Sequence, residues 1–293
     1  MADGLFNEAF LKKIELLYLV SKKVFAGNAQ ATRRSRKLGA GIEVADFRPY
    51  AAGDDLRHVD WNYYSSTREL LVRLFEEEED LHITFLLDTS RSMQVGDGAK
   101  LRYAKELVAA LSYIGLANLD RVSVVPFSSD IATRLPSSRG RGQIWKVFRF
   151  LEQDFDASTT DLRNALHRFV AQTRRRGLVV LVSDFYDPSG FVDGINLLRY
   201  HRFEPLVVQV FDEDELNPRL KGDVELTDCE TGARVRVTVT PKLLERYREA
   251  HQRMMDELAD YCRTKDLLYF RAPVQLPFDE LVLRVFRAGG FLR

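Results

Sequence analysis

The sequence predicts an α/β protein with a doubly wound, mostly parallel β-sheet. Two apolar runs, residues 81–87 and 178–182, have the length of buried strands and are followed by polar residues that include an aspartate. Segments with helical periodicity alternate with these and further strand-like runs along residues 81–293. Strands that are apolar on both faces are typical of a parallel sheet with helices on both sides.

Size and composition limit the class of protein. The 293 residues are 45% hydrophobic, so the chain can bury a substantial core. Lys plus Arg and Asp plus Glu both number 43, and this balance gives no electrostatic argument for nucleic acid or an anionic membrane. The two cysteines are far apart, and no apolar run is long enough to span a bilayer. We therefore expect a cytoplasmic protein without a transmembrane segment.

Residues 1–80 are predicted to be an N-terminal helix and an irregular extension packed on the main domain. Residues 5–25 have helical spacing, and docking on the protein's own core is favoured over membrane binding. Residues 32–37 carry four cations, and residues 76–80 are all acidic. Residues 39–61 lack a clean period and are interpreted as a specified loop, in which Arg48, Arg57, Asp55 and Asp60 pair with one another.

The main domain, residues 81–293, continues the alternation. Helices are expected at 99–119, 141–152, 160–174, 190–201, 241–264 and 277–287, and strands at 122–127, 205–211 and 267–270. Residues 223–239 alternate on both sides of Glu230-Thr-Gly-Ala233 and predict a β-hairpin inserted into the sheet or extending it.

The candidate site follows the first apolar run. Asp88, Ser90 and Ser92 offer hard oxygen ligands within one turn of chain, which suits a small divalent cation. The same residues are also common in turns and at helix N-caps, so this stretch alone leaves a structural role equally open.

Two further loops favour the metal. Asp184 ends a second strand of the same sheet, and the loop before residues 160–174 supplies Thr159 and Thr160. Carboxyl ends of parallel strands meet at one edge, so these groups should converge. Two carboxylates with hydroxyl groups leave room for waters in a near-octahedral shell, and we expect Mg²⁺, with Mn²⁺ or Ca²⁺ as alternatives.

The pattern resembles the metal-ion-dependent adhesion site of von Willebrand factor type A domains, in which Asp-x-Ser-x-Ser, a later Thr and a later Asp hold magnesium. The matching residues here are Asp88, Ser90, Ser92, Thr160 and Asp184. Thr160 is preferred to its neighbour because it stands six residues before the leucine of an Ala-Leu pair, the spacing which that family shows. The resemblance implies a von Willebrand factor A-like fold.

A second resemblance is to the bacterial domain-of-unknown-function family fifty-eight, which looks like a variant of the same fold. It covers residues 39–93 strongly and the remainder by the order of the elements. The matched positions are Gly39, Gly41, Arg48, Tyr50, Gly53-Asp54-Asp55, Arg57, Asp60-Trp61, Val72, Phe75 and Glu76. Relatives are typically encoded beside MoxR-type AAA+ ATPases, which implies such a partner.

Two functions remain open. The first is a non-enzymatic, metal-dependent interaction module that binds an acidic side chain of a MoxR-type ATPase or of its client, with Arg91 and Thr159 at the rim of the site. The second is a magnesium-dependent phosphatase or phosphotransferase with Asp88 as nucleophile. The first is favoured because such phosphatases carry a second Asp two residues later, where this chain has Ser90.

Overall fold

A computed structural model describes residues 5–28, 38–76, 81–155 and 159–288. These residues divide into two units. One contains residues 5–21 together with 81–155 and 159–288, and the other contains residues 22–28 and 38–76. The predicted basic loop at 32–37 and most of the acidic run at 76–80 lie outside the described residues.

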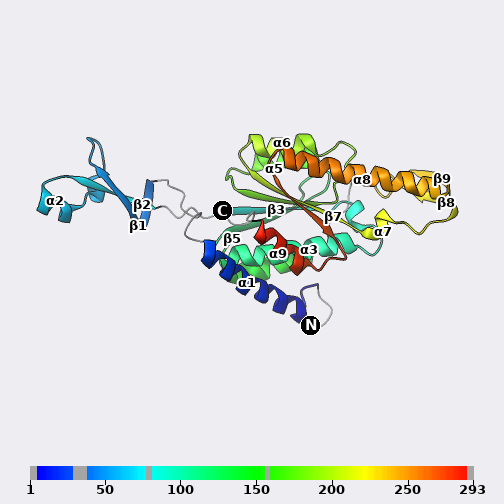
Figure 1. Cartoon of the computed structure of the whole chain (residues 1–293), viewed down its shortest axis with the longest axis horizontal. Coiled ribbons are helices and arrows are strands. Elements are labelled where there is room, and N and C mark those ends of the chain that lie inside the picture. Colours follow the sequence, from blue (N-terminus) through cyan, green and yellow to red (C-terminus); the bar gives the residue numbers. More distant parts are fainter. Residues whose placement is uncertain (1–4, 29–37, 77–80, 156–158, 289–293) are drawn as a thin grey trace. The chain divides into compact units, whose positions relative to one another are not determined.

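A six-stranded sheet forms the centre of the larger unit (Figure 1). Its strand order is β10-β7-β6-β3-β4-β5; β5 is antiparallel to its neighbour and the other pairings are parallel. The strands are β3 (His82–Asp88), β4 (Arg121–Phe127), β5 (Leu135–Arg139), β6 (Leu178–Ser183), β7 (Glu204–Phe211) and β10 (Leu268–Pro273). The predicted α/β class with a mostly parallel sheet is therefore confirmed.

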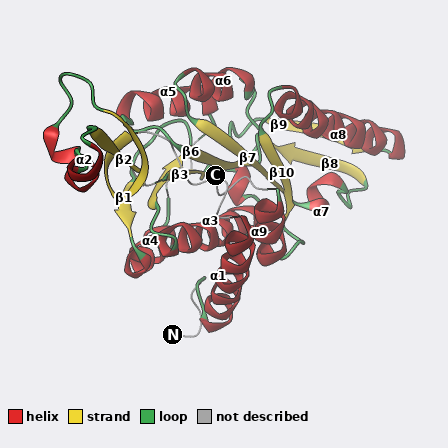
Figure 2. Cartoon of the chain, turned by 60° about the vertical axis from the view of Figure 1, so that its left-hand side comes forward, coloured by secondary structure: helices red, strands yellow, loops and turns green. Residues whose placement is uncertain are grey.

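Helices cover both faces of this sheet. Figures 1 and 2 place α5, α6 and α8 on one face and α3 and α9 on the other. Because both faces are covered, every residue of β6 is buried, which explains its unbroken apolar sequence. The helices of this unit are α3 (Ala99–Ala117), α4 (Ile144–Leu151), α5 (Leu162–Gln172), α6 (Val192–Tyr200), the short α7 (Glu213–Leu216), α8 (Pro241–Thr264) and α9 (Phe278–Arg287).

The first part of α1 (Glu8–Asn28) packs on the larger unit. Phe10, Ile14 and Leu17 are buried, and the ring of Phe10 lies 5.0 Å from that of Phe278 in α9. The apolar face predicted from helical spacing therefore docks on the protein's own core. Among the described residues, no helix combines the length and the apolar character that a membrane span requires.

The predicted hairpin is confirmed as β8 (Gly222–Thr227) and β9 (Arg234–Val239). Its expected insertion into the main sheet, or extension of that sheet, is wrong, because among the described residues these strands pair only with each other in a two-stranded antiparallel sheet. Most of their side chains are exposed. The hairpin comes after β7 and α7 in the chain and leads into α8.

The smaller unit corrects the expectation of a loop at residues 39–61. Strand β1 (Leu38–Pro49) pairs with β2 (Leu71–Glu76), and the register shifts twice between Gly39 and Asp46. Such irregularities interrupt the alternation of apolar and polar residues by which a strand is recognised in a sequence. Helix α2 (Trp61–Thr67) follows a single 3₁₀ turn and was also missed; its N-cap, Asp60, accepts hydrogen bonds from two backbone amides.

The expected charge pairs of this unit are only partly right. Arg57 and Asp55 pair at 2.6 Å, as predicted. Arg48 instead pairs with Asp54 at 2.6 Å, and Asp60 pairs with Arg73 of β2 at 3.0 Å. Both predictions failed because the actual partners are brought close by a turn, for Arg48, and by strand pairing, for Asp60. That the extension packs on the main domain stays a prediction for residues 22–80.

Candidate functional site

The candidate site lies at the point where the sheet reverses its winding order. From β3 the chain passes to β4 on one side and then returns to β6, β7 and β10 on the other. Strands β3 and β6 are therefore neighbours, with Leu87 opposite Val182. Asp88 ends β3, and Asp184 follows β6 directly. Ligands of open α/β sheets bind beyond the strand ends at such a reversal.

Asp88 is fully buried and anchors the first loop. Its Oδ1 accepts a hydrogen bond of 2.9 Å from the backbone N–H of Ser90, and its Oδ2 accepts one of 2.5 Å from the hydroxyl of Ser183. The hydroxyl oxygens of Ser90 and Ser92 lie 3.0 Å apart, and both residues are buried. Asp88 and the two serines of this loop, together with Ser183 at the end of β6, therefore place one carboxylate and three hydroxyls at the strand ends.

Burial raises the pKa of Asp88 to about 7, and the charge of Asp184 adds to this effect. The hydrogen bonds from Ser183 and Ser90 oppose the rise in pKa but do not cancel it. Two buried carboxylates thus repel each other at this edge of the sheet, and a cation placed between them would relieve that repulsion.

Asp184 is also buried and has a cationic partner that the sequence did not reveal. Its Oδ2 accepts a 2.9 Å hydrogen bond from the ammonium group of Lys100, in the first turn of α3. The same ammonium pairs with Glu215 of α7 at 2.7 Å and lies 4.8 Å from the ring centre of Tyr186. Burial alone would lower the pKa of Lys100, but the charges of Asp184 and Glu215 raise it overall.

Thr160 lies in the loop before α5 and is 8% exposed. Its hydroxyl donates a 2.7 Å hydrogen bond to the carboxylate of Glu230, at the turn of the β8–β9 hairpin. The backbone carbonyl of Glu230 accepts a 2.9 Å hydrogen bond from Arg91. Arg91 and Thr159, the predicted rim residues, are both exposed. Glu230 therefore connects the loop of Thr160 to the loop that carries the two serines.

The five predicted ligands thus fall into two groups. Hydrogen bonds and charge connect Asp88, Ser90, Ser92 and Asp184 directly, whereas Thr160 is connected to their loop through Glu230. Among the described residues, no group of three or more His, Cys, Asp or Glu side chains could hold a metal ion. The five predicted ligands do not form such a group, because three of them are the hydroxyl-bearing residues Ser90, Ser92 and Thr160. Their donor types fit a hard cation that keeps some waters.

Sequence reasoning missed Lys100, Ser183, Glu215 and Glu230. One signal could have found Lys100: a cation in the first turn of a helix opposes the helix dipole, and so suggests a nearby carboxylate. The other three carry no local signal. Ser183 was assigned to the end of a strand and Glu230 to a hairpin turn, and no prediction was made for Glu215.

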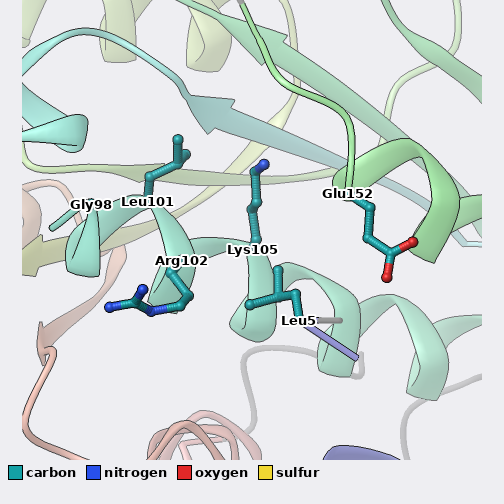
Figure 3. Close-up of a pocket in the computed structure, with 6 residues that line it drawn as sticks. All are labelled: Leu5, Gly98, Leu101, Arg102, Lys105 and Glu152. Atoms are coloured by element: carbon teal, nitrogen blue, oxygen red, sulfur yellow. The ribbon is translucent and has the colours of Figure 1, made fainter. Parts of the chain in front are cut away.

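A cavity of about 490 Å³ lies beside this cluster. Its lining includes Ser92, Lys100, Tyr186, Cys229, Tyr247 and His251. It therefore extends from the serine loop, along the hairpin turn, to α8. A separate cavity of about 560 Å³ is lined by Leu5, Gly98, Leu101, Arg102, Lys105 and Glu152 (Figure 3). This second cavity includes none of the predicted ligands.

A family model described as "Protein of unknown function DUF58" matches residues 46–257, which is more than half of the chain. The chain belongs to the DUF58 family. This confirms the family resemblance drawn from the sequence. Relatives of this DUF58 protein include uncharacterized proteins of Mycobacterium bovis and Mycobacterium tuberculosis. Each is 27% identical over 217 residues, which cover 72% of this chain and 68% of the relative.

Two similar solved structures come from Bacteroides. A conserved hypothetical protein, BatB, of Bacteroides thetaiotaomicron is 13% identical, with a TM-score of 0.44 over 71% of this chain and 98% of the other. An aerotolerance-related membrane protein of Bacteroides fragilis is 16% identical, with a TM-score of 0.45 over 71% of this DUF58 chain and 97% of the other.

Proposed function

We propose that this protein is a non-enzymatic, metal-dependent protein-interaction module. In this proposal the sheet domain is von Willebrand factor A-like and carries a metal-ion-dependent adhesion site. Asp88, Ser90, Ser92, Thr160 and Asp184 would hold Mg²⁺, with Mn²⁺ or Ca²⁺ as alternatives. When bound, the ion would supply an open coordination position for an anionic oxygen of a partner.

The observation that carries the proposal is the buried pair of carboxylates at the reversal point. Asp88 and Asp184 are both buried at the strand ends, and the ammonium of Lys100 pairs with Asp184 and with Glu215. Asp88 makes its contacts to neutral donors, the Ser183 hydroxyl and the Ser90 amide. Burying an uncompensated charge is costly, so a divalent cation beside Asp88 would stabilise the site.

The hydroxyl groups suit binding rather than hydrolysis. Serine and threonine ligands are neutral, so the ion would keep part of its positive charge and attract one more anion. The contact between Thr160 and Glu230 supports this, because a carboxylate already fits at that position. We propose a MoxR-type AAA+ ATPase or its client as the partner, bound in the cytoplasm through an acidic side chain, with Arg91 and Thr159 at the rim.

The alternative is a magnesium-dependent phosphatase or phosphotransferase with Asp88 as nucleophile. One observation favours it: Lys100 brings a buried ammonium to the strand ends, where a transferring phosphoryl group would need a cation. Two observations oppose it. Lys100 is engaged by Asp184 and Glu215, and the place of a general acid two residues after Asp88 is taken by Ser90.

The test is a pull-down of the MoxR-type ATPase from the same genome, with and without magnesium. Wild type and Asp97→Asn, an exposed carboxylate of the same loop, should capture it only with magnesium, and Asp88→Ala should not. The same proteins are screened for phosphatase and nucleotidase turnover. Magnesium-dependent turnover by the wild type that is lost in Asp88→Asn would show that the protein is the enzyme and would contradict the interaction module.

A further inference from the structure

The turn of the β8–β9 hairpin holds Glu230 in a fixed place. Oδ1 of Asp228 accepts hydrogen bonds from the backbone N–H groups of Glu230 and Thr231, at 3.0 and 2.6 Å, and from the Thr231 hydroxyl at 2.8 Å. Gly232 takes a φ of +73°, which a glycine adopts without strain. The turn is therefore preorganised, and side-chain entropy is the main cost of placing Glu230.

Glu230 is half-buried, although most of the hairpin is exposed. Its carboxylate accepts the Thr160 hydroxyl at 2.7 Å and the Thr160 backbone N–H at 3.2 and 3.3 Å. Its carbonyl oxygen accepts Arg91 at 2.9 Å. One residue of the hairpin thus contacts a predicted metal ligand and a predicted rim residue, which belong to different loops.

The hairpin also closes one side of the site. Cys229, the residue before Glu230, lines the 490 Å³ cavity together with Ser92 and Lys100. Tyr247 of α8 faces the same cavity, and its hydroxyl donates a 2.9 Å hydrogen bond to the carbonyl of Glu215. The hairpin turn therefore stands over the serine loop and forms a wall of the cavity beside it.

We infer that Glu230 is the chain's own carboxylate ligand at the metal site, and that the β8–β9 hairpin keeps the open position closed. This inference rests on the proposed function, because it needs a cation at the predicted site. An acidic side chain of a partner would have to displace Glu230. A carboxylate adds a negative charge to the ligand set and so strengthens binding of the ion, while it excludes one water.

The experiment titrates Mn²⁺ alone into the full chain by calorimetry and measures the hydration of the bound ion by water-proton relaxation. The variant is Glu230→Gln, which keeps the size and the hydrogen-bond acceptor that Thr160 requires. Glu225→Gln is the matched control, because Glu225 lies on the same hairpin and pairs with Arg234 and Arg236. Circular dichroism checks that all three proteins are folded.

We expect Glu230→Gln to bind Mn²⁺ about tenfold more weakly than wild type, because the ligand set loses one negative charge, and to increase the hydration of the bound ion, because water displaces a neutral amide oxygen more readily than a carboxylate. Glu225→Gln should match wild type in both measurements. Equal affinity and equal hydration in wild type and Glu230→Gln would overturn this inference and leave the proposed function standing. Absence of Mn²⁺ binding by wild type would overturn the proposed function itself, and the inference with it.

Discussion

Lys100 donates a 2.9 Å hydrogen bond to Asp184, and the side chains of both residues are almost completely shielded from solvent. The ammonium also pairs with Glu215 at 2.7 Å. A buried charge is tolerated when opposite charges and hydrogen bonds compensate it. Lys100 therefore acts as a built-in cation on the Asp184 side of the site, whereas the hydrogen-bond donors that Asp88 has among the described residues, the Ser90 amide and the Ser183 hydroxyl, are neutral.

Replacing Lys100 by methionine should destabilise the protein by about 3–5 kcal/mol, because two carboxylates would lose their buried partner. The measurement is urea denaturation in the presence of a chelator. Mg²⁺ should restore part of the loss, since a bound ion would compensate Asp184 in place of the ammonium.

Arg102→Met is the matched control for this change. Arg102 lies on the same helix and pairs at 3.0 Å with Asp97, but both side chains are exposed. An exposed pair of this kind contributes little to the free energy of unfolding, because solvent screens it. Equal losses in Lys100→Met and Arg102→Met would contradict a compensating role for Lys100.

Asp88→Asn should stabilise the metal-free protein at about pH 8, by roughly 1–3 kcal/mol. The folded pKa of Asp88 is raised from 3.8 to about 7, so the folded state holds its proton more tightly than the unfolded state. Stability of the wild type therefore falls as pH rises from the unfolded pKa through the folded pKa. Asparagine carries no charge, so the variant does not lose stability in this way as the pH rises.

Denaturation in a chelator at about pH 4 and pH 8 measures the difference, which should shrink toward zero or reverse at the lower pH. Asp97→Asn serves as the control, because the pKa of Asp97 is shifted in the opposite direction to that of Asp88. Hydrogen bonding to Arg102 lowers the pKa of Asp97, so the charged form is favoured in the folded state. A stabilisation of Asp88→Asn that is the same at both pH values would contradict the raised pKa.

The sheet and the two strand-end aspartates could be predicted because their signals are local. Unbroken apolar runs indicate buried parallel strands, and the polar residue that ends each run marks the edge of the sheet. Strand β5 was missed for the opposite reason. Its sequence, Leu-Pro-Ser-Ser-Arg, is polar and contains proline, which is tolerated at an edge but gives no strand pattern.

The contacts that surround the candidate site could not be predicted. Thr160 and Glu230 are 70 residues apart, and Arg91 and Glu230 are 139 apart. Only the placement of the hairpin brings these residues together, and no residue type or spacing encodes that placement locally. The same is true of Lys100 and Glu215, whose pairing depends on the placement of α7 beside the first turn of α3.

Asp54→Ala should make the smaller unit more sensitive to trypsin, with cleavage after Arg57 several-fold faster. Asp54 accepts a forked pair of hydrogen bonds from Arg48, at 2.6 and 2.7 Å, and a third from the backbone N–H of Ala51. These bonds close the turn that follows β1. Mass spectrometry of timed digests identifies the cut, and Glu69→Ala, an exposed residue of the same unit, is the control. Early cleavage of the wild type between residues 39 and 61 would contradict a fixed segment.

The affinity of the wild type for Mn²⁺ should rise with pH up to about 7 and then level off. A metal ligand must be deprotonated, and burial together with Asp184 raises the pKa of Asp88 to about 7. Below that pH the ion competes with one proton, so the affinity should fall about tenfold for each unit of pH. Calorimetry at several pH values measures the slope, and repeating it in buffers of different ionisation enthalpy measures the protons released.

Asp88→Asn should bind Mn²⁺ weakly and without this slope, because the competing proton is absent. Asp97→Asn, which changes an exposed carboxylate of the same loop, should keep both the affinity and the slope of the wild type. A steep slope that persists in Asp88→Asn would assign the proton to another group. A wild-type affinity that is constant between about pH 5 and pH 8 would mean that Asp88 does not ligate the ion, since a ligand with this pKa must lose its proton on binding.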